Sequence, residues 1–352
     1  MNLPHLDLLT APVPCLATAE AEVIARDIYG LDGRASGLSG ERDRNFKLRN
    51  ADGRTFIVKL SNPSETEDVI DFQIQALLHL EAVAPDLYVP RVVRALNGET
   101  TYRVPDRDGN SLIVRVLTYI SGTPLHEVES TATLRDSIAD FLARLDLALR
   151  DFDHPASRHA LLWNLTRAAS LRELLVHVPR DRRPLIERQL DRFEQRVAPQ
   201  IPQLRSQVIH NDLNPQNAVV DKNRHDHIAG VFDFGDMVHA PLINELAIAA
   251  AYQLKRNNFP LGVIGSMAAR YSARYPLKRL ELELLVDLIA TRLMLTVCIG
   301  AWRATLHPGN SSYILRSHAD AWEGLAWMDE LDPKAARAIL HKACEGYLDN
   351  DE

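Results

Sequence analysis

The sequence predicts an α+β protein of two lobes, a small antiparallel sheet with one main helix followed by a larger and mostly helical part. Short runs of β-branched and apolar residues alternate with turn-forming residues up to about position 119. One helical pattern interrupts these runs, and from residue 134 onward almost every segment has helical periodicity except residues 210–236. This order predicts lobes over residues 1–121 and 122–352, which meet near Ser121-Gly122-Thr123-Pro124.

The first lobe is expected to start with a helix over residues 19–29, because its apolar residues share one helical face and Gly30 is a stop signal. Turn-formers then separate runs that predict strands over residues 35–39, 45–49, 55–60, 88–95, 100–104 and 112–119. The main helix is predicted over residues 64–80. Asn62-Pro63-Ser64 opens it, and Glu65 and Glu67 in the first turn suit the positive end of the helix dipole.

Composition and charge exclude several classes of protein. The 352 residues are 46% hydrophobic and 25% charged, which is typical of a globular chain and not of a disordered or collagen-like one. Forty Lys and Arg residues stand against 47 Asp and Glu, a net charge of -7. We therefore expect neither a nucleic-acid partner nor a membrane partner.

The cysteines and apolar segments predict a cytoplasmic protein. Three scattered cysteines form neither a disulfide framework nor a zinc spacing, which fits a reducing compartment. Residues 1–14 lack the basic start and long apolar core of a signal peptide. The most apolar later run, residues 284–302, carries Asp287 and Arg292 in its interior, so it predicts a buried helix instead of a membrane span.

A polar loop between two predicted strands carries the groups that phosphoryl transfer needs. His210, Asp212 and Asn217 fit the pattern H-x-D-x-x-x-x-N, and a second short strand ends in Asp233-Phe234-Gly235. Because a turn over residues 221–226 reverses the chain, the loop is expected to lie beside Asp233. Phosphoryl transfer uses a carboxylate near the acceptor hydroxyl. It also uses an amide oxygen and a second carboxylate that bind Mg²⁺. The motifs together predict a phosphotransferase.

On these residues the chain resembles the aminoglycoside phosphotransferase and choline kinase superfamily, whose fold is like that of protein kinases. The likeness is closer to hydroxylysine kinases and their bacterial relatives. It rests on IHNDLNPQN at 209–217, FDFGDMVHAPLINELAIA at 232–249, LWNL at 162–165, Arg292-Leu293 and GAWR at 300–303. The resemblance implies that Asp212 is the catalytic base, that Asn217 and Asp233 hold Mg²⁺, and that ATP or GTP is the phosphoryl donor.

The first lobe is then expected to hold the nucleotide. Lys59, the single lysine in the apolar run 56–60, fits a contact with the α- and β-phosphates, with a solvated strand lysine as the alternative. The loop over residues 39–46 stands where kinases cover the phosphates. It has one glycine, and Ser39, Arg42 and Asn45 are its candidate phosphate contacts beside the backbone N–H groups. An ordinary charged hairpin is the alternative for this loop.

Two further features concern the nucleotide. Gln73 stands where kinases place the glutamate that pairs with the strand lysine, and it is expected to hydrogen-bond Lys59 without neutralising it. Residues 116–122 look like the hinge whose backbone binds the purine, with Thr118 and Ile120 as contacts. Backbone contacts do not separate ATP from GTP, although the likeness to hydroxylysine kinases implies GTP.

The acceptor site is expected to be built from the helical segment between about residues 155 and 207 and from the late helices, beside the motif loop. Asp236 either holds an amine of the acceptor or orients the loop, and Glu245 opens the helix predicted at 244–252. Trp163 offers its face to a cation or packs in the core, while Asn164 stands where the family often has Asp.

Two other positions have more than one interpretation. Arg292 and Arg303 lie on an apolar helix and need acidic partners, either a substrate carboxylate or, as the favoured alternative, an internal salt bridge. His210 is expected to be structural, packing in the loop without transferring protons.

The sequence therefore predicts a Mg²⁺-dependent kinase for the hydroxyl of a small amine-containing metabolite, acting as a monomer or homodimer. A hydroxylysine-like hydroxy-amino acid is the favoured acceptor, and homoserine, choline or ethanolamine, and aminoglycosides are the alternatives. A non-catalytic kinase-like protein would be expected to lack one of Lys59, Asp212, Asn217 and Asp233, all of which are present. A protein kinase is disfavoured because no Ala-Pro-Glu segment follows Gly235.

Overall fold

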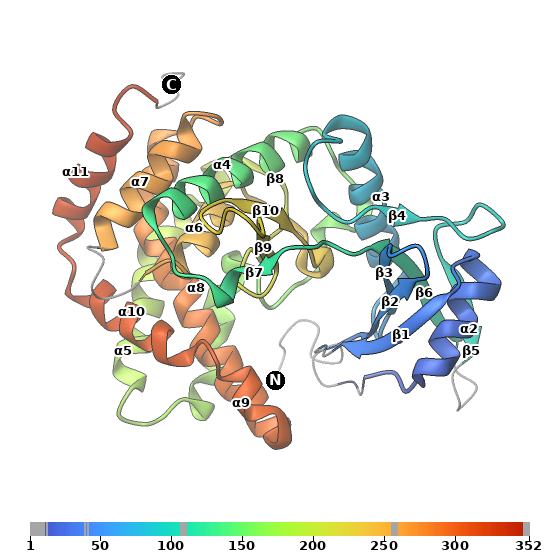
Figure 1. Ribbon diagram of the computed structural model, residues 1–352. Coiled ribbons are helices and arrows are strands. Elements are labelled where there is room, and N and C mark those ends of the chain that lie inside the picture. The colour runs from blue at the N-terminus through green and yellow to red at the C-terminus, as the bar shows by residue number, and fades with distance from the viewer. Residues whose placement is uncertain are drawn as a thin grey trace.

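The computed structural model describes residues 11, 13–38, 40, 42–105, 111–254 and 260–347. Figure 1 shows a sheet-based part in blue and teal beside a larger helical part in green to red. The predicted α+β fold, with a small antiparallel first part and a mostly helical second part, is confirmed.

An antiparallel sheet of six strands forms the first part. The strand order is β1-β2-β3-β6-β4, and β5 pairs with β6. The strands are β1 (Gly33–Leu38), β2 (Arg44–Asn50), β3 (Thr55–Leu60), β4 (Val92–Val93), β5 (Tyr102–Pro105) and β6 (Ser111–Thr118). Alternate residues of β2, β3 and β6 are buried in one apolar cluster with helix α2 (Thr18–Tyr29). Gly30 ends α2 with a φ of 67°, as predicted from its lack of a Cβ.

Two predicted elements of the first part differ in the structure. The main helix, α3 (Glu67–Val83), begins three residues later than expected, because the hydroxyl of Thr66 accepts the backbone N–H of Val69 and caps the helix there. The predicted strand over 88–95 shrinks to β4, since only Val92 and Val93 pair with β6.

Helix α3 connects the two parts. Its apolar residues Phe72, Ala76, Leu77 and Leu80 are buried in the large cluster formed by the helical part, not in the cluster beneath the sheet. Gln73, Ile74 and Leu77 of α3 line the cavity between the sheet and the helical part.

The second part is built around α8 (Arg279–Leu306), whose middle is buried on all sides. This helix is long and apolar enough to cross a membrane by composition, but most of that stretch is buried inside the fold, as predicted for residues 284–302. The other helices are α4 (Ala132–Leu149), α5 (Arg183–Arg192), α6 (Ile243–Ala251), α7 (Pro260–Ser272), α9 (Ser311–Ile314), α10 (His318–Glu330) and α11 (Pro333–Ala343).

Residues 155–203 contain less α-helix than their periodicity predicts. Apart from α5, they form 3-10 turns at Pro155–Arg158, Leu165–His177 and Ala198–Gln203, and a π-helical turn at Phe193–Val197.

Two small sheets in the second part carry the motif loops. The first has the order β10-β9-β7, from β7 (Thr123–Pro124), β9 (Ala218–Val220) and β10 (Ile228–Val231), and the second pairs β8 (Ser206–Ile209) with β11 (Val238–Pro241). Gly122 lets β7 approach β9, because a Cβ there would lie 2.6 Å from the Cβ of Val219.

Candidate active site

The loop between β8 and β9 and the end of β10 lie side by side, as the sequence predicts. His210 is fully buried and joins them: its Nδ1 accepts the backbone N–H of Asp212 (3.3 Å), and its Nε2 donates to the carbonyl of Phe232 (3.2 Å). Its ring also meets the edge of Phe234, with centroids 4.7 Å apart. These contacts support the structural role predicted for His210.

Both motif segments contain a residue in the left-handed region of the backbone map. Asn211 has a φ of 63° and Asp233 a φ of 62°, values that Asn and Asp tolerate better than most residues. The N–H of Asn211 donates to Oε2 of Glu245 over 2.9 Å. Glu245 is completely buried beneath the loop and does not line the cavity, and burial raises the pKa of its carboxyl. The structure thus places Glu245 behind the loop, where it supports the backbone, and not in the acceptor site where we expected it.

The carboxylate of Asp212 is fixed by three side chains. Its Oδ2 accepts from Nδ2 of Asn217 (2.7 Å) and from Nδ2 of Asn214 (3.0 Å), and its Oδ1 accepts from Nη2 of Arg292 (2.7 Å). Asn214 was not singled out from the sequence, although it lies within the motif. A carboxylate held at both oxygens has little rotational freedom, so it is oriented before an acceptor arrives.

The surroundings of Asp212 also change its proton affinity. Burial raises the pKa of Asp212 to about 7, Arg292 opposes this shift, and the neighbouring carboxylates of Asp236 and Asp233 add to it. A general base with a pKa near neutrality is well matched to accepting a proton from a hydroxyl.

Arg292 forms an internal salt bridge, the alternative favoured from the sequence. Its guanidinium bonds Asp212 and the hydroxyl of Tyr252 (3.0 Å), and its side chain is only 3% exposed. The guanidinium carbon lies over the rings of Trp163 and Tyr252, at 5.0 and 5.5 Å from their centroids. Both contacts are of the cation–π type. Trp163 therefore contacts a cation of the protein itself.

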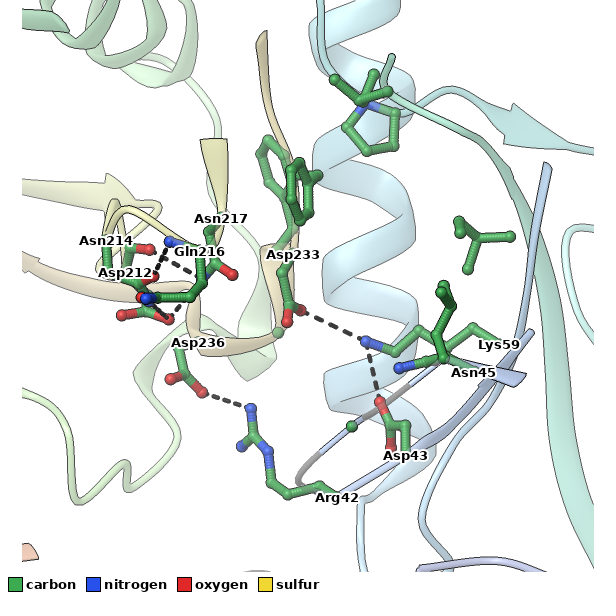
Figure 2. A pocket seen from close by; sticks show the side chains of 18 of the residues that line it. Arg42, Asp43, Asn45, Lys59, Asp212, Asn214, Gln216, Asn217, Asp233 and Asp236 are labelled. Carbon is green, nitrogen blue, oxygen red and sulfur yellow. Dashed lines mark hydrogen bonds and ion pairs between the residues drawn. The ribbon is translucent and has the colours of Figure 1, made fainter. Parts of the chain in front are cut away.

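The oxygens of Asn217 and Asp233 fit a Mg²⁺ site. The amide nitrogen of Asn217 is used by Asp212, whereas in the described part of the chain its Oδ1 accepts no hydrogen bond. Figure 2 shows this oxygen on the side of Asp233, whose side chain is 51% exposed and lies 3.5 Å from Nζ of Lys59. Lys59 holds the pKa of Asp233 below its usual range. An amide oxygen and an ionised carboxylate are ligands that Mg²⁺ prefers.

Lys59 has a charged partner that is not predicted from the sequence. Its Nζ lies 2.9 Å from Oδ2 of Asp43, whose Oδ1 accepts the backbone N–H of Asn62 over 2.8 Å. Burial disfavours the charge on Lys59, but Asp43 and Asp233 outweigh burial and raise its pKa. Asp43 lies within the predicted phosphate-covering loop, so its position could have suggested this role.

Gln73 does not bond Lys59 as the sequence predicted. Its Oε1 accepts from Arg115 over 2.6 Å, and its Nε2 donates to Glu65 and to the carbonyl of Gly235. The hydrogen bond that we expected between Gln73 and Lys59 is thus replaced by one to Arg115. Gln73 still lines the cavity beside Lys59.

The loop between β1 and β2 reaches the motif segment through Arg42. Nη2 of Arg42 donates to Oδ1 of Asp236 over 2.6 Å, as Figure 2 shows. Asn45 lines the same cavity, and its buried Oδ1 has no partner among the described residues. Ser39, the third candidate of this loop, lies outside the described residues.

The predicted hinge runs along the cavity wall. Thr118 is fixed by Arg91: its N–H donates to the carbonyl of Arg91, and its hydroxyl accepts the N–H of Arg91, each over 2.9 Å. In the described part of the chain, the backbone N–H of Ile120 takes part in no hydrogen bond. Ile120 thus keeps a backbone donor for a ligand.

Asn164 has a local role instead of the predicted acceptor contact. Its side-chain oxygen accepts from the N–H and the hydroxyl of Thr166, which caps the 3-10 turn that follows. It does not line the cavity.

A cavity of about 720 Å³ unites the remaining predicted residues. Its lining combines residues from the sheet, the motif loops and α8, among them Arg42, Asn45, Lys59, Gln73, Thr118, Ile120, Trp163, Asp212, Asn217, Asp233, Asp236 and Arg292. Segments far apart in the chain thus bring basic and acidic side chains together around one cavity.

Known proteins that are similar to this chain in sequence or in structure are phosphotransferases. A family model described as "Phosphotransferase enzyme family" matches residues 35–281. Hydroxylysine kinase from Mus musculus is 26% identical over 360 residues, which cover 95% of each chain, and the Bos taurus enzyme is 25% identical over 358 residues with the same coverage. An amicoumacin kinase solved with AMP-PNP, Ca²⁺ and Ami superposes with a TM-score of 0.68 at 16% identity, covering 91% of this chain and 97% of that one.

Proposed function

This chain belongs to the Phosphotransferase enzyme family and is a small-molecule kinase, and we propose that it transfers the γ-phosphoryl group of ATP or GTP to the hydroxyl of a hydroxylysine-like hydroxy-amino acid. One observation carries the proposal. Lys59 on β3, Asp212 and Asn217 in the loop between β8 and β9, and Asp233 after β10 line one cavity and supply the groups that phosphoryl transfer uses.

In this proposal Asp212 orients the acceptor hydroxyl and accepts its proton. Asn217 and Asp233 would hold Mg²⁺, which supplies charge neutralisation between the phosphates when it is bound. Lys59, kept charged by Asp43, steadies the phosphates, and the hinge around Ile120 offers backbone groups to the purine. The proposal also assigns nucleotide binding to residues 1–121. It assigns catalysis and acceptor binding to residues 122–352.

The acceptor class follows from the charges of the cavity and from the relatives. Asp212 and Asp236, which are paired with Arg292 and Arg42 in this structure, are the carboxylates that would attract the ammonium group of an acceptor. Arg303 lies on the face of α8 that lines the cavity, further along the helix from Arg292, and is a candidate contact for a carboxylate. An amine and a carboxylate on one hydroxylated molecule describe a hydroxy-amino acid, which agrees with the hydroxylysine kinases among the relatives.

The experiment is a coupled phosphotransfer assay with ATP and GTP in parallel. We expect the highest kcat/KM for 5-hydroxylysine among 5-hydroxylysine, homoserine, ethanolamine, choline and an aminoglycoside. A preference for ethanolamine or choline would replace the hydroxy-amino acid with an amino alcohol, and phosphorylation of the aminoglycoside alone would identify a resistance enzyme. Failure to phosphorylate any of the five would reject the acceptor class. Cytoplasmic location, the absence of nucleic-acid and membrane partners, and a monomeric or dimeric state remain predictions.

A further inference from the structure

Arg42 joins the two walls of the cavity. It belongs to the loop that follows β1, and its bond to Asp236 reaches the segment that follows β10, 194 positions later in the chain. The two side chains are 19% and 12% exposed, so this ion pair is shielded from solvent far better than an ordinary surface pair. The carbonyl of Arg42 also accepts from Nδ2 of Asn62 over 3.1 Å, which fixes the backbone while the side chain spans the cavity.

The guanidinium of Arg42 lies beside the groups predicted to surround the phosphates. A Cβ added to Gly235 would lie 3.2 Å from Nη2 of Arg42, 3.1 Å from Oδ1 of Asp233 and 4.0 Å from Nζ of Lys59. The three charged groups therefore converge on one point, and Gly235 leaves room for them. A guanidinium at this point is within reach of Asp236 and of a phosphoryl group held by Lys59.

We propose that Arg42 is shared between Asp236 and the terminal phosphates of the nucleotide, so that nucleotide binding draws Arg42 away and leaves Asp236 to bind the ammonium group of the acceptor. The inference rests on the proposed function, because it assigns a cationic acceptor to Asp236. Guanidinium groups bind carboxylates and phosphates with the same forked donors, so the two anions compete for one arginine.

The charge balance at Asp236 supports this exchange. Arg42 is its ion-pair partner among the residues that the structure describes, the buried Arg292 also attracts it from further away, and the carboxylate of Asp212 repels it. A carboxylate in this position attracts a cation once its arginine has turned away. By thermodynamic linkage, the acceptor must then strengthen nucleotide binding by the same factor by which the nucleotide strengthens acceptor binding.

A double-mutant cycle on nucleotide binding tests the exchange without an acceptor. Titration calorimetry with Mg²⁺ and AMP-PNP would compare the wild type, Arg42→Ala, Asp236→Asn and the double variant. We expect Asp236→Asn to bind the nucleotide about tenfold more tightly than the wild type, because Arg42 no longer has to leave a carboxylate. In the Arg42→Ala background the same change should have little effect. An equal gain in both backgrounds would show simple repulsion by Asp236 and would overturn the proposal.

The second arm measures binding of 5-hydroxylysine with and without Mg²⁺ and AMP-PNP. The wild type is expected to bind it about tenfold more tightly in the presence of nucleotide, whereas Arg42→Ala should bind it with similar affinity in both conditions. Arg54→Ala is the matched control, because Arg54 forms an exposed ion pair with Asp52 in the neighbouring hairpin and should keep the wild-type response.

The two arms separate the inference from the proposed function. Coupling in the nucleotide cycle, combined with no binding of 5-hydroxylysine, would support the sharing of Arg42 and reject the acceptor. Phosphorylation of 5-hydroxylysine without coupling in either arm would support the function and overturn the role of Arg42.

Discussion

Arg292 on α8 donates a hydrogen bond of 2.7 Å to the carboxylate of Asp212 in the motif loop, 80 positions earlier in the chain. The arginine lies over the rings of Trp163 and Tyr252 and is almost inaccessible to solvent. It is therefore better suited to orient the carboxylate than to contact a substrate directly, and it is a positioning residue in the proposed mechanism.

Replacing Asp212 with Asn should lower kcat by about 10²–10⁴, because the amide cannot accept the proton of the acceptor hydroxyl. The binding of nucleotide should change little. Asp226→Asn, an exposed carboxylate in the nearby β9–β10 turn, is the control. Near-wild-type turnover of Asp212→Asn would remove Asp212 from its role as base. Asp212→Asn also removes the charged partner of the buried Arg292, which should lower the stability of the fold. The melting temperature of the variant should therefore be measured as well.

Replacing Asp233 with Ala should abolish measurable Mg²⁺-dependent turnover, whereas Asn217→Ala should raise the Mg²⁺ concentration required. The difference follows from charge, because a carboxylate binds a hard divalent cation more strongly than an amide oxygen does. Initial rates over a Mg²⁺ titration measure both effects. Equal and mild effects of the two changes would mean that these residues only shape the hairpin.

Replacing Asp43 with Asn should raise the KM for nucleotide by about tenfold, because Lys59 loses the charged partner that holds its ammonium group. Gln73→Ala should change this KM much less, since Gln73 contacts Arg115 and not Lys59. Steady-state kinetics on both variants, with melting temperatures, make the comparison. A larger effect of Gln73→Ala would restore Gln73 as the functional partner of the lysine.

Replacing Arg292 with Ala should lower kcat by about 10–10²-fold for every acceptor, because the base is no longer held in one orientation. Arg188→Ala, which removes an exposed ion pair with Asp329, is the matched control. The measurement is kcat and KM for an amino acid acceptor and for the corresponding amino alcohol. A rise in KM confined to the amino acid would show instead that Arg292 binds the substrate carboxylate.

The activity should fall as the pH is lowered through about 7, because burial raises the pKa of Asp212 to about 7 and the protonated form cannot act as a base. Asp212 acts as a base only when it is ionised, so activity is kept above this pKa and lost below it. The pH profile of kcat/KM for the nucleotide, which reports the free enzyme, measures the transition. A flat profile between pH 5.5 and 8.5 would contradict a base with this pKa.

The sequence predicts the local features of this protein well. The strands at 55–60 and 112–119 and the buried helix at 284–302 follow from apolar patterning, which depends on the residues of each segment alone. The motif residues Asp212, Asn217 and Asp233 are likewise set by short spacings within one strand-loop-strand unit, so their proximity could be expected.

Only the tertiary structure decided which charged groups meet across the cavity. The pairs Lys59–Asp43, Arg42–Asp236 and Arg292–Asp212 join separate elements, and Glu245 faces the interior instead of the acceptor. A charged side chain accepts any opposite charge that packing brings within reach, and its type and sequence position do not select among several candidates. The sequence by itself therefore determined which charged groups the site contains, and the packing of the sheet and of α8 against the motif loops decided how those charges are paired.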